Sequence, residues 1–186
     1  IVSLQDINWD TMDKEKSVLK CSAETGVFFG IYLVATFLSL VYSTSSPLLS
    51  MVGLALFAGT PIVMASLMYR YHTSHIETSN FISVWTFGSS TFIFGGLIWA
   101  FVAYFWLEYI LPGFIVTQAK EALILYESVP ETKDLAFTKA LRATIENNEL
   151  PSPIYFTLQM LWSSLSLGIF MSLILTPIVR LLKRKI

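Results

Sequence analysis

The sequence predicts an all-α integral membrane protein: a four-helix bundle with an extracytoplasmic helical hairpin between the third and fourth spans. Of its 186 residues, 54% are hydrophobic and only 13% are charged, whereas soluble domains carry roughly 25% charged residues. Four apolar stretches are long enough to cross a bilayer, and lysine and arginine are distributed unequally among the segments that join them. A soluble fold of this composition would expose large apolar patches to water. We therefore expect a membrane domain.

The four spans follow from length. A helix needs roughly 20 apolar residues to cross a hydrocarbon core of about 30 Å. The stretches that meet this requirement are residues 21–42, 48–69, 81–111 and 154–182, which we expect to form a single membrane domain over residues 21–182. They lack the strict alternation of barrel strands, so their backbone groups must be satisfied within helices.

The basic residues predict the orientation. Eight of them lie in the predicted N-terminal segment 1–20, the turn after the second span, and the end of the chain with its basic tail 183–186: Lys14, Lys16, Lys20, Arg70, Arg180, Lys183, Arg184 and Lys185. The segment between the third and fourth spans instead has four basic and six acidic residues, and a seventh acidic residue, Glu108, lies at the end of the third span. Because lysine and arginine favour the cytoplasmic side, we expect both termini to be cytoplasmic. The first twenty residues contain no apolar core of a signal peptide.

The outer segment, residues 112–153, is more polar but keeps helical periodicity. One helix is predicted to start at Pro112, and a second to run from Thr132 to Asn147, before Pro151 and Pro153 interrupt the chain. Together they form the hairpin. Two roles remain open for it: a connection between two spans, or a docking surface for a partner.

Small residues recur at intervals of four in every span. Such spacing lets helix backbones approach closely in lipid. The residues expected in helix packing or partner binding are Gly26, Gly30, Ala55, Gly59, Gly96, Ala100, Ser164, Gly168, Ser172 and Thr176. Packing within the chain should use most of these faces, and a leftover face would bind a second protein.

Groups that carry chemistry are scarce. No ionisable residue lies in the middle of a span, where such groups mark ion and proton pathways. His72 and His75 have a spacing that metal sites use, but a structural zinc site needs four ligands. Arg70 and His72 are instead expected to meet lipid headgroups. We predict no catalytic, cofactor-binding or metal-ligating residue. The single Cys21 forms no internal disulfide, and the net charge of −1 does not favour nucleic acid.

A resemblance rests on a few local features. These are the opening Gly26 to Gly30, Tyr69-Arg70 with a short turn through Ile76 to Phe81, then Gly88, a long aromatic-rich helix and the break Tyr109-Ile110-Leu111-Pro112. In these the chain resembles an uncharacterised bacterial family of small four-helix membrane proteins, a domain of unknown function. The resemblance implies a location in the bacterial inner (cytoplasmic) membrane and the same four-span topology that the apolar stretches predict. It supplies no activity, and only a loose association with membrane-associated glycosyltransferases or other envelope machinery.

Two functions are therefore consistent with the sequence. The first is a non-enzymatic accessory or scaffold subunit of a bacterial envelope complex, surrounded by membrane lipids and bound to another membrane protein or to itself. The second is a small homo-oligomeric transporter or lipid-handling protein, compatible with kinks predicted at Pro61 and Pro177. An enzyme acting on lipid headgroups is a third reading, and it lacks an identifiable acid, base or metal site.

Overall fold

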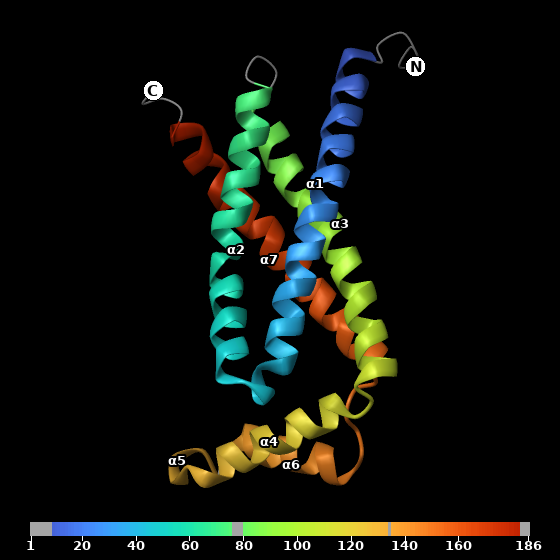
Figure 1. The fold of residues 1–186 in the computed structure, drawn as a ribbon, viewed down its shortest axis with the longest axis vertical. Helices are drawn as coiled ribbons and strands as arrows, with labels where there is room; N and C mark the ends of the chain where they lie inside the picture. The colour runs from blue at the N-terminus through green and yellow to red at the C-terminus, as the bar shows by residue number, and fades with distance from the viewer. Residues whose placement is uncertain (1–8, 76–79, 134, 183–186) are drawn as a thin grey trace, which may run out of the picture. The chain divides into compact units, whose positions relative to one another are not determined.

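The computed structural model describes residues 9–75, 80–133 and 135–182, and every element assigned within them is helical (Figure 1). Four helices are long and apolar enough to cross a membrane, over Val18–Val41, Pro47–Ser74, Phe81–Ile110 and Pro153–Leu182. The protein is therefore a multi-pass membrane protein, and the all-α, four-span prediction is confirmed. The predicted span limits differ from these by five residues at most.

The first two long helices extend beyond their predicted spans. Helix α1 covers Trp9–Val41, so it begins inside the segment predicted to precede the membrane. A short 3-10 turn, η2 (Tyr42–Ser45), leads to α2, Pro47–Ser74. Pro47 occupies the first turn of α2, where its missing N–H costs nothing. Helix α2 continues through Pro61, a predicted kink site, and ends beyond Arg70.

The other two long helices are α3, Phe81–Phe105, and α7, Pro153–Leu182, which continues through Pro177. Helix α3 passes directly into a π-helical segment, η3, Trp106–Ile110. The Leu111 N–H closes it by donating to the Trp106 carbonyl at 2.9 Å. Together, α3 and this π-helical segment form the third span, which ends at Ile110.

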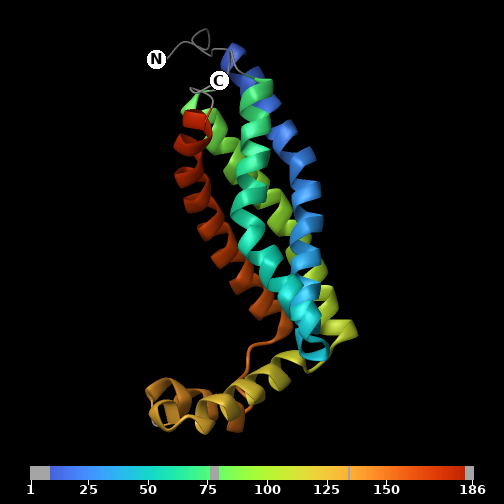
Figure 2. The same ribbon diagram turned by 60° about the vertical axis from the view of Figure 1, so that its left-hand side comes forward.

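The chain separates into two compact units. One contains the described residues up to Trp99 together with those from Leu161 onward, and the other is Ala100–Met160. In the first unit, α1, α2 and the adjoining parts of α3 and α7 run side by side, as Figures 1 and 2 both show. The start of α1 and the end of α7 lie at the same end of this unit, as expected for four spans.

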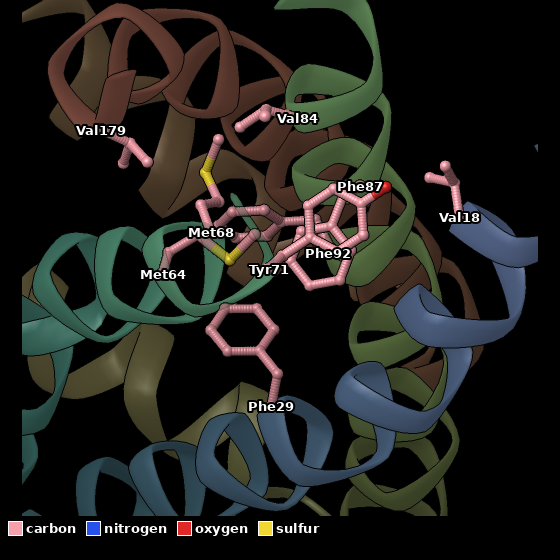
Figure 3. Packing of buried hydrophobic residues seen from close by; sticks show 9 residues of the cluster. All are labelled: Val18, Phe29, Met64, Met68, Tyr71, Val84, Phe87, Phe92 and Val179. Carbon is pink, nitrogen blue, oxygen red and sulfur yellow. The ribbon is translucent and has the colours of Figure 1, made fainter. Parts of the chain in front are cut away.

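All four long helices contribute to one core in this unit (Figure 3). The ring of Tyr71 on α2 stacks on Phe87 of α3, with centroids 4.2 Å apart, and Phe29 of α1 meets Phe92 of α3 edge to face at 4.9 Å. The other members of the core are Val18, Met64, Met68, Val84 and Val179. Because lipid tails are as apolar as these side chains, close van der Waals contact must hold the helices together.

The second unit contains α4 (Phe114–Ser128), α5 (Pro130–Lys133) and α6 (Ala136–Glu146). The predicted start at Pro112 was wrong: Gly113 has φ +88°, a left-handed backbone that cannot continue a helix, so α4 begins at Phe114. The second predicted helix is also interrupted. Only its part from Ala136 is one regular helix, and Leu135 before it is extended.

Candidate functional site

The predicted small residues of α1 lie against α3. A Cβ at Gly26 would be 2.6 Å from the Cβ of Phe94, and one at Gly30 would be 3.0 Å from the Cβ of Ile98. Gly95 lies opposite: a Cβ there would be 3.2 Å from both the Gly26 carbonyl oxygen and the Gly30 amide nitrogen. These three glycines therefore let two helix backbones meet.

The small residues of α7 also pack within the chain. A Cβ at Gly168 would lie 2.4 Å from the Phe92 ring, so that ring fills the space above the glycine. Ser172 and Thr176, the next two residues of the same stripe, are fully buried. A Cβ at Gly96 on α3 would approach the ends of Leu161 and Leu165. The α7 stripe is thus used in contact with α3.

The remaining predicted small residues differ in exposure. Ala55 on α2 is exposed, whereas Gly59 faces the Tyr32 hydroxyl of α1. Ala100 is buried and Ser164 is half-buried. Of the ten predicted residues, Ala55 is therefore the one that the first unit leaves uncovered.

Sequence reasoning left Gly53, Gly88 and Gly95 out of the packing set. A Cβ at Gly53 would meet Leu40 of α1 at 2.9 Å, and one at Gly88 would meet the Ser172 Oγ at 2.8 Å. Gly88 and Gly95 are seven residues apart, which places them on one face of α3. That spacing is the sequence signal that could have identified Gly88 and Gly95 as packing residues.

Polar groups inside the helix contacts are mostly hydroxyls, since Ser22, Thr36, Ser90, Thr91, Ser172 and Thr176 are all buried. The buried Ser22 hydroxyl lies 2.8 Å from its own-helix carbonyl at Val18 and 3.3 Å from the Phe87 carbonyl of α3. The Ser172 Oγ is also buried, but it forms no hydrogen bond with any residue that the structure describes.

The two residues predicted to meet lipid headgroups occupy different environments. Arg70 is exposed and makes no ion pair with a described residue, whereas His72 is only 8% exposed. A buried imidazole cannot present itself to a headgroup, so Arg70 is the accessible member of the pair. The nearby His75 ring stacks on Tyr71 at 4.8 Å. Among the described residues, no cluster of three possible metal ligands is found.

A groove lies between α2 and α7 in the first unit. It has a volume of about 590 Å³ and opens widely to the surroundings. Residues from the middle to the end of α2, with two from α7, form its walls: Pro61, Ile62, Ala65, Ser66, Tyr69, Arg70, Leu175 and Leu182. Sequence reasoning named Arg70 but did not predict the groove, because it exists only between two helices distant in sequence.

The hairpin unit has its own polar and apolar features. Arg142 of α6 donates from Nη2 to Oε1 of Glu127 on α4 at 2.6 Å, and from Nε to the same oxygen at 2.9 Å. Tyr126 and Phe137 pack edge to face at 5.5 Å. Around the turn that joins these helices, large apolar side chains remain exposed: Ile124, Leu125, Val129, Leu135 and Phe137.

One family match covers most of the first and fourth spans and all of the second and third, with the break after the third. The family model of DUF4199, a protein family of unknown function, matches residues 24–180. The chain belongs to the DUF4199 family. The match includes the α2 wall of the groove from Pro61 to Arg70, the glycine contact between α1 and α3, and the helices α4, α5 and α6. The resemblance noted from the sequence is thereby confirmed.

Comparison of this DUF4199 chain with curated proteins and with solved structures found no match. The family description assigns no substrate or partner. The surfaces that the fold leaves uncovered are therefore the candidate binding sites.

Proposed function

We propose that this DUF4199 protein is a non-enzymatic accessory or scaffold subunit that binds another membrane protein in a bacterial envelope complex, with both termini cytoplasmic. The observation that carries the proposal is the exposure of α2. Only 11% of the residues in its most apolar 18-residue stretch are buried, compared with 44% in the corresponding stretch of the third span. A span covered so little by its own chain has most of its surface available for lipid or for another helix.

The exposed face of α2 has the residue sizes that a partner helix requires. Gly53 and Gly59 point toward α1, and the opposite face presents Met51, Ala55 and Ala58 to the surroundings. Small side chains such as the two alanines let a second backbone approach closely, which favours helix association in lipid. This face replaces the glycine stripes of α1 and α7 as the membrane contact, because those stripes pack within the chain.

The hairpin supports a second contact with the same partner. The hairpin lies outside the predicted spans, so without a partner its exposed apolar side chains would face water. These side chains are Ile124, Leu125, Val129, Leu135 and Phe137. The hairpin follows the third span directly in the sequence, after Leu111–Gly113. We expect the partner of α2 to cover this surface as well.

The experiment is photo-crosslinking in intact membranes. A photoreactive amino acid is placed at Ala55 or Ala58, at Phe137 of the hairpin, and at the control position Ile174, an exposed residue of α7. We expect one discrete adduct with the same partner from Ala55, Ala58 and Phe137, and none from Ile174. Blue-native electrophoresis in mild detergent should show a complex of matching size.

Two results would overturn the proposal. Equal, diffuse labelling from Ala55 and Ile174 would mean that α2 faces only lipid. An adduct consisting of two copies of this chain would favour the second candidate, a homo-oligomeric lipid-handling or transport protein. One observation favours that candidate: the open groove that ends at Arg70.

A further inference from the structure

The groove between α2 and α7 extends over one half of the membrane span. Pro61 lies near the middle of the Pro47–Ser74 helix and Arg70 near its end. Nine residues at about 1.5 Å per residue place these two about 14 Å apart along the helix. Half of a hydrocarbon core of about 30 Å is about 15 Å. The groove therefore matches the depth of a single leaflet.

The walls of the groove suit hydrocarbon. Ile62, Ala65, Leu175 and Leu182 supply apolar surface along its length. Ser66 also lines it, but its hydroxyl is bonded back to the Ile62 carbonyl at 2.9 Å. A polar ligand would find no convergent donors or acceptors in this stretch, whereas an acyl chain needs none.

The end of the groove has the opposite character. The Arg70 guanidinium is exposed and makes no ion pair with a described residue, and Tyr69 lies beside it in the lining. A planar guanidinium binds phosphate through two parallel hydrogen bonds. This end belongs to the side of the bilayer that the basic residues predict to be cytoplasmic, where anionic lipids attract basic side chains.

We propose that the groove binds one anionic glycerophospholipid, with an acyl chain between α2 and α7 and its phosphate at Arg70. A partner helix fits less well, because apolar side chains would give the exposed Arg70 guanidinium no counter-charge. A free phosphate ion would leave the apolar walls uncovered. The lipid is the occupant that matches both the charge and the depth.

This proposal is independent of the accessory role. The partner face around Ala55 lies in the half of α2 before Pro61, and the groove lies in the half after it. Loss of one contact would therefore leave the other in place.

The test uses the full chain, purified in mild detergent, stripped of lipid and titrated by native mass spectrometry. The probes are phosphatidylglycerol, phosphatidylcholine and inorganic phosphate. We expect one phosphatidylglycerol to bind with an affinity at least fivefold above that for phosphatidylcholine, and phosphate neither to bind nor to compete at equal concentration. Equal affinity for the two lipids, or competition by phosphate alone, would overturn the proposal.

Matched variants locate the site. Arg70→Gln should reduce phosphatidylglycerol affinity about fivefold and remove the preference over phosphatidylcholine, while Arg70→Lys keeps part of it. Arg180→Gln is the control, because Arg180 is an exposed cation of α7 outside the groove lining. Equal losses in the Arg70→Gln and Arg180→Gln variants would mean nonspecific attraction and would refute the site.

A second pair tests the apolar part. Ser66→Phe places a ring in the groove and should weaken both lipids, whereas Leu167→Phe, at an exposed position of α7 outside the groove, should weaken neither. Both positions are exposed, so both variants should retain the wild-type elution volume and helical circular dichroism. If Ser66→Phe binds lipid as tightly as the wild type, the acyl chain does not lie in this groove.

Discussion

The Tyr32 hydroxyl of α1 donates a hydrogen bond to the backbone carbonyl of Leu56 on α2. The Thr60 hydroxyl approaches the same oxygen at 3.3 Å. Pro61 follows, and its missing N–H leaves the next carbonyl of α2, that of Phe57, without its helical donor. Side-chain donors are thus concentrated where the hydrogen-bond ladder of α2 is weakest, and one of them joins two spans.

Replacing Tyr32 by phenylalanine tests this joint. The variant keeps the ring that stacks on Phe29 at 6.2 Å and removes only the hydroxyl. Interhelical hydrogen bonds in membranes contribute about 0.6 kcal/mol on average and at most about 1.7 kcal/mol. We expect a loss within this range in the free energy of unfolding, measured by detergent titration with circular dichroism. Tyr109→Phe, at an exposed position, is the control, and an equal loss there would contradict the assignment.

The contact of α1 with α3 should be sensitive to a single methyl group at Gly26. An alanine Cβ there would lie 2.6 Å from the Phe94 Cβ, which belongs to the part of a side chain that cannot rotate away. Overpacking of this kind costs about 1–3 kcal/mol. Gly96→Ala is the comparison, because its new Cβ would meet only leucine side-chain ends at 3.3 Å. We expect the thermal midpoint to fall clearly more for Gly26→Ala, and similar midpoints would show that the helices separate easily.

Ser172 should be replaceable by alanine without loss of stability. Its Oγ is buried with no hydrogen-bond partner among the described residues. Burying an unpaired hydroxyl costs about 1–3 kcal/mol, so Ser172→Ala should unfold at the same or a higher detergent concentration. The matched control is Ser22→Ala, which removes a hydroxyl that reaches the Val18 carbonyl at 2.8 Å. If Ser172→Ala is the less stable of the two, its hydroxyl has a bound partner such as water.

Gly113 should tolerate asparagine better than alanine. Its φ of +88° lies in the left-handed region, and a Cβ there would meet nothing within 4 Å. The penalty for alanine is therefore conformational, about 1–2 kcal/mol, and asparagine enters this region more readily. Hydrogen exchange of the amides at the start of α4 should be faster in Gly113→Ala and nearly unchanged in Gly113→Asn. Equal exchange in both variants would indicate that the backbone relaxes to another conformation.

The four spans were predictable because a long run of apolar residues is a property of the sequence alone. Which face of each span is buried was not. In α2, apolar residues occupy all sides of the helix, so no stripe distinguishes the side toward α1 from the side toward lipid. Gly59 and Ala55 therefore looked equivalent in sequence, although one faces Tyr32 and the other is exposed.

The candidate site was predictable only in part. Arg70 was identified because a cation at the end of a span is conspicuous in sequence. The burial of His72 and the groove beside Arg70 depend on how α2 packs against helices far away in the chain. The start of α4 was misplaced for a local reason: a proline suits the first turn of a helix, but the left-handed Gly113 directly after it does not.

The π segment at Trp106–Ile110 contains one residue more than α-helical winding would use for the same turn. Removing one residue there should restore ordinary α-helix and leave the chain that follows in nearly the same orientation, because the π turn already absorbs the extra residue. The end of the third span can therefore lose one residue without altering any residue of α3 before Trp106 or the course of the chain after Ile110. Among family members, a one-residue deletion at this point would preserve the packing of the spans.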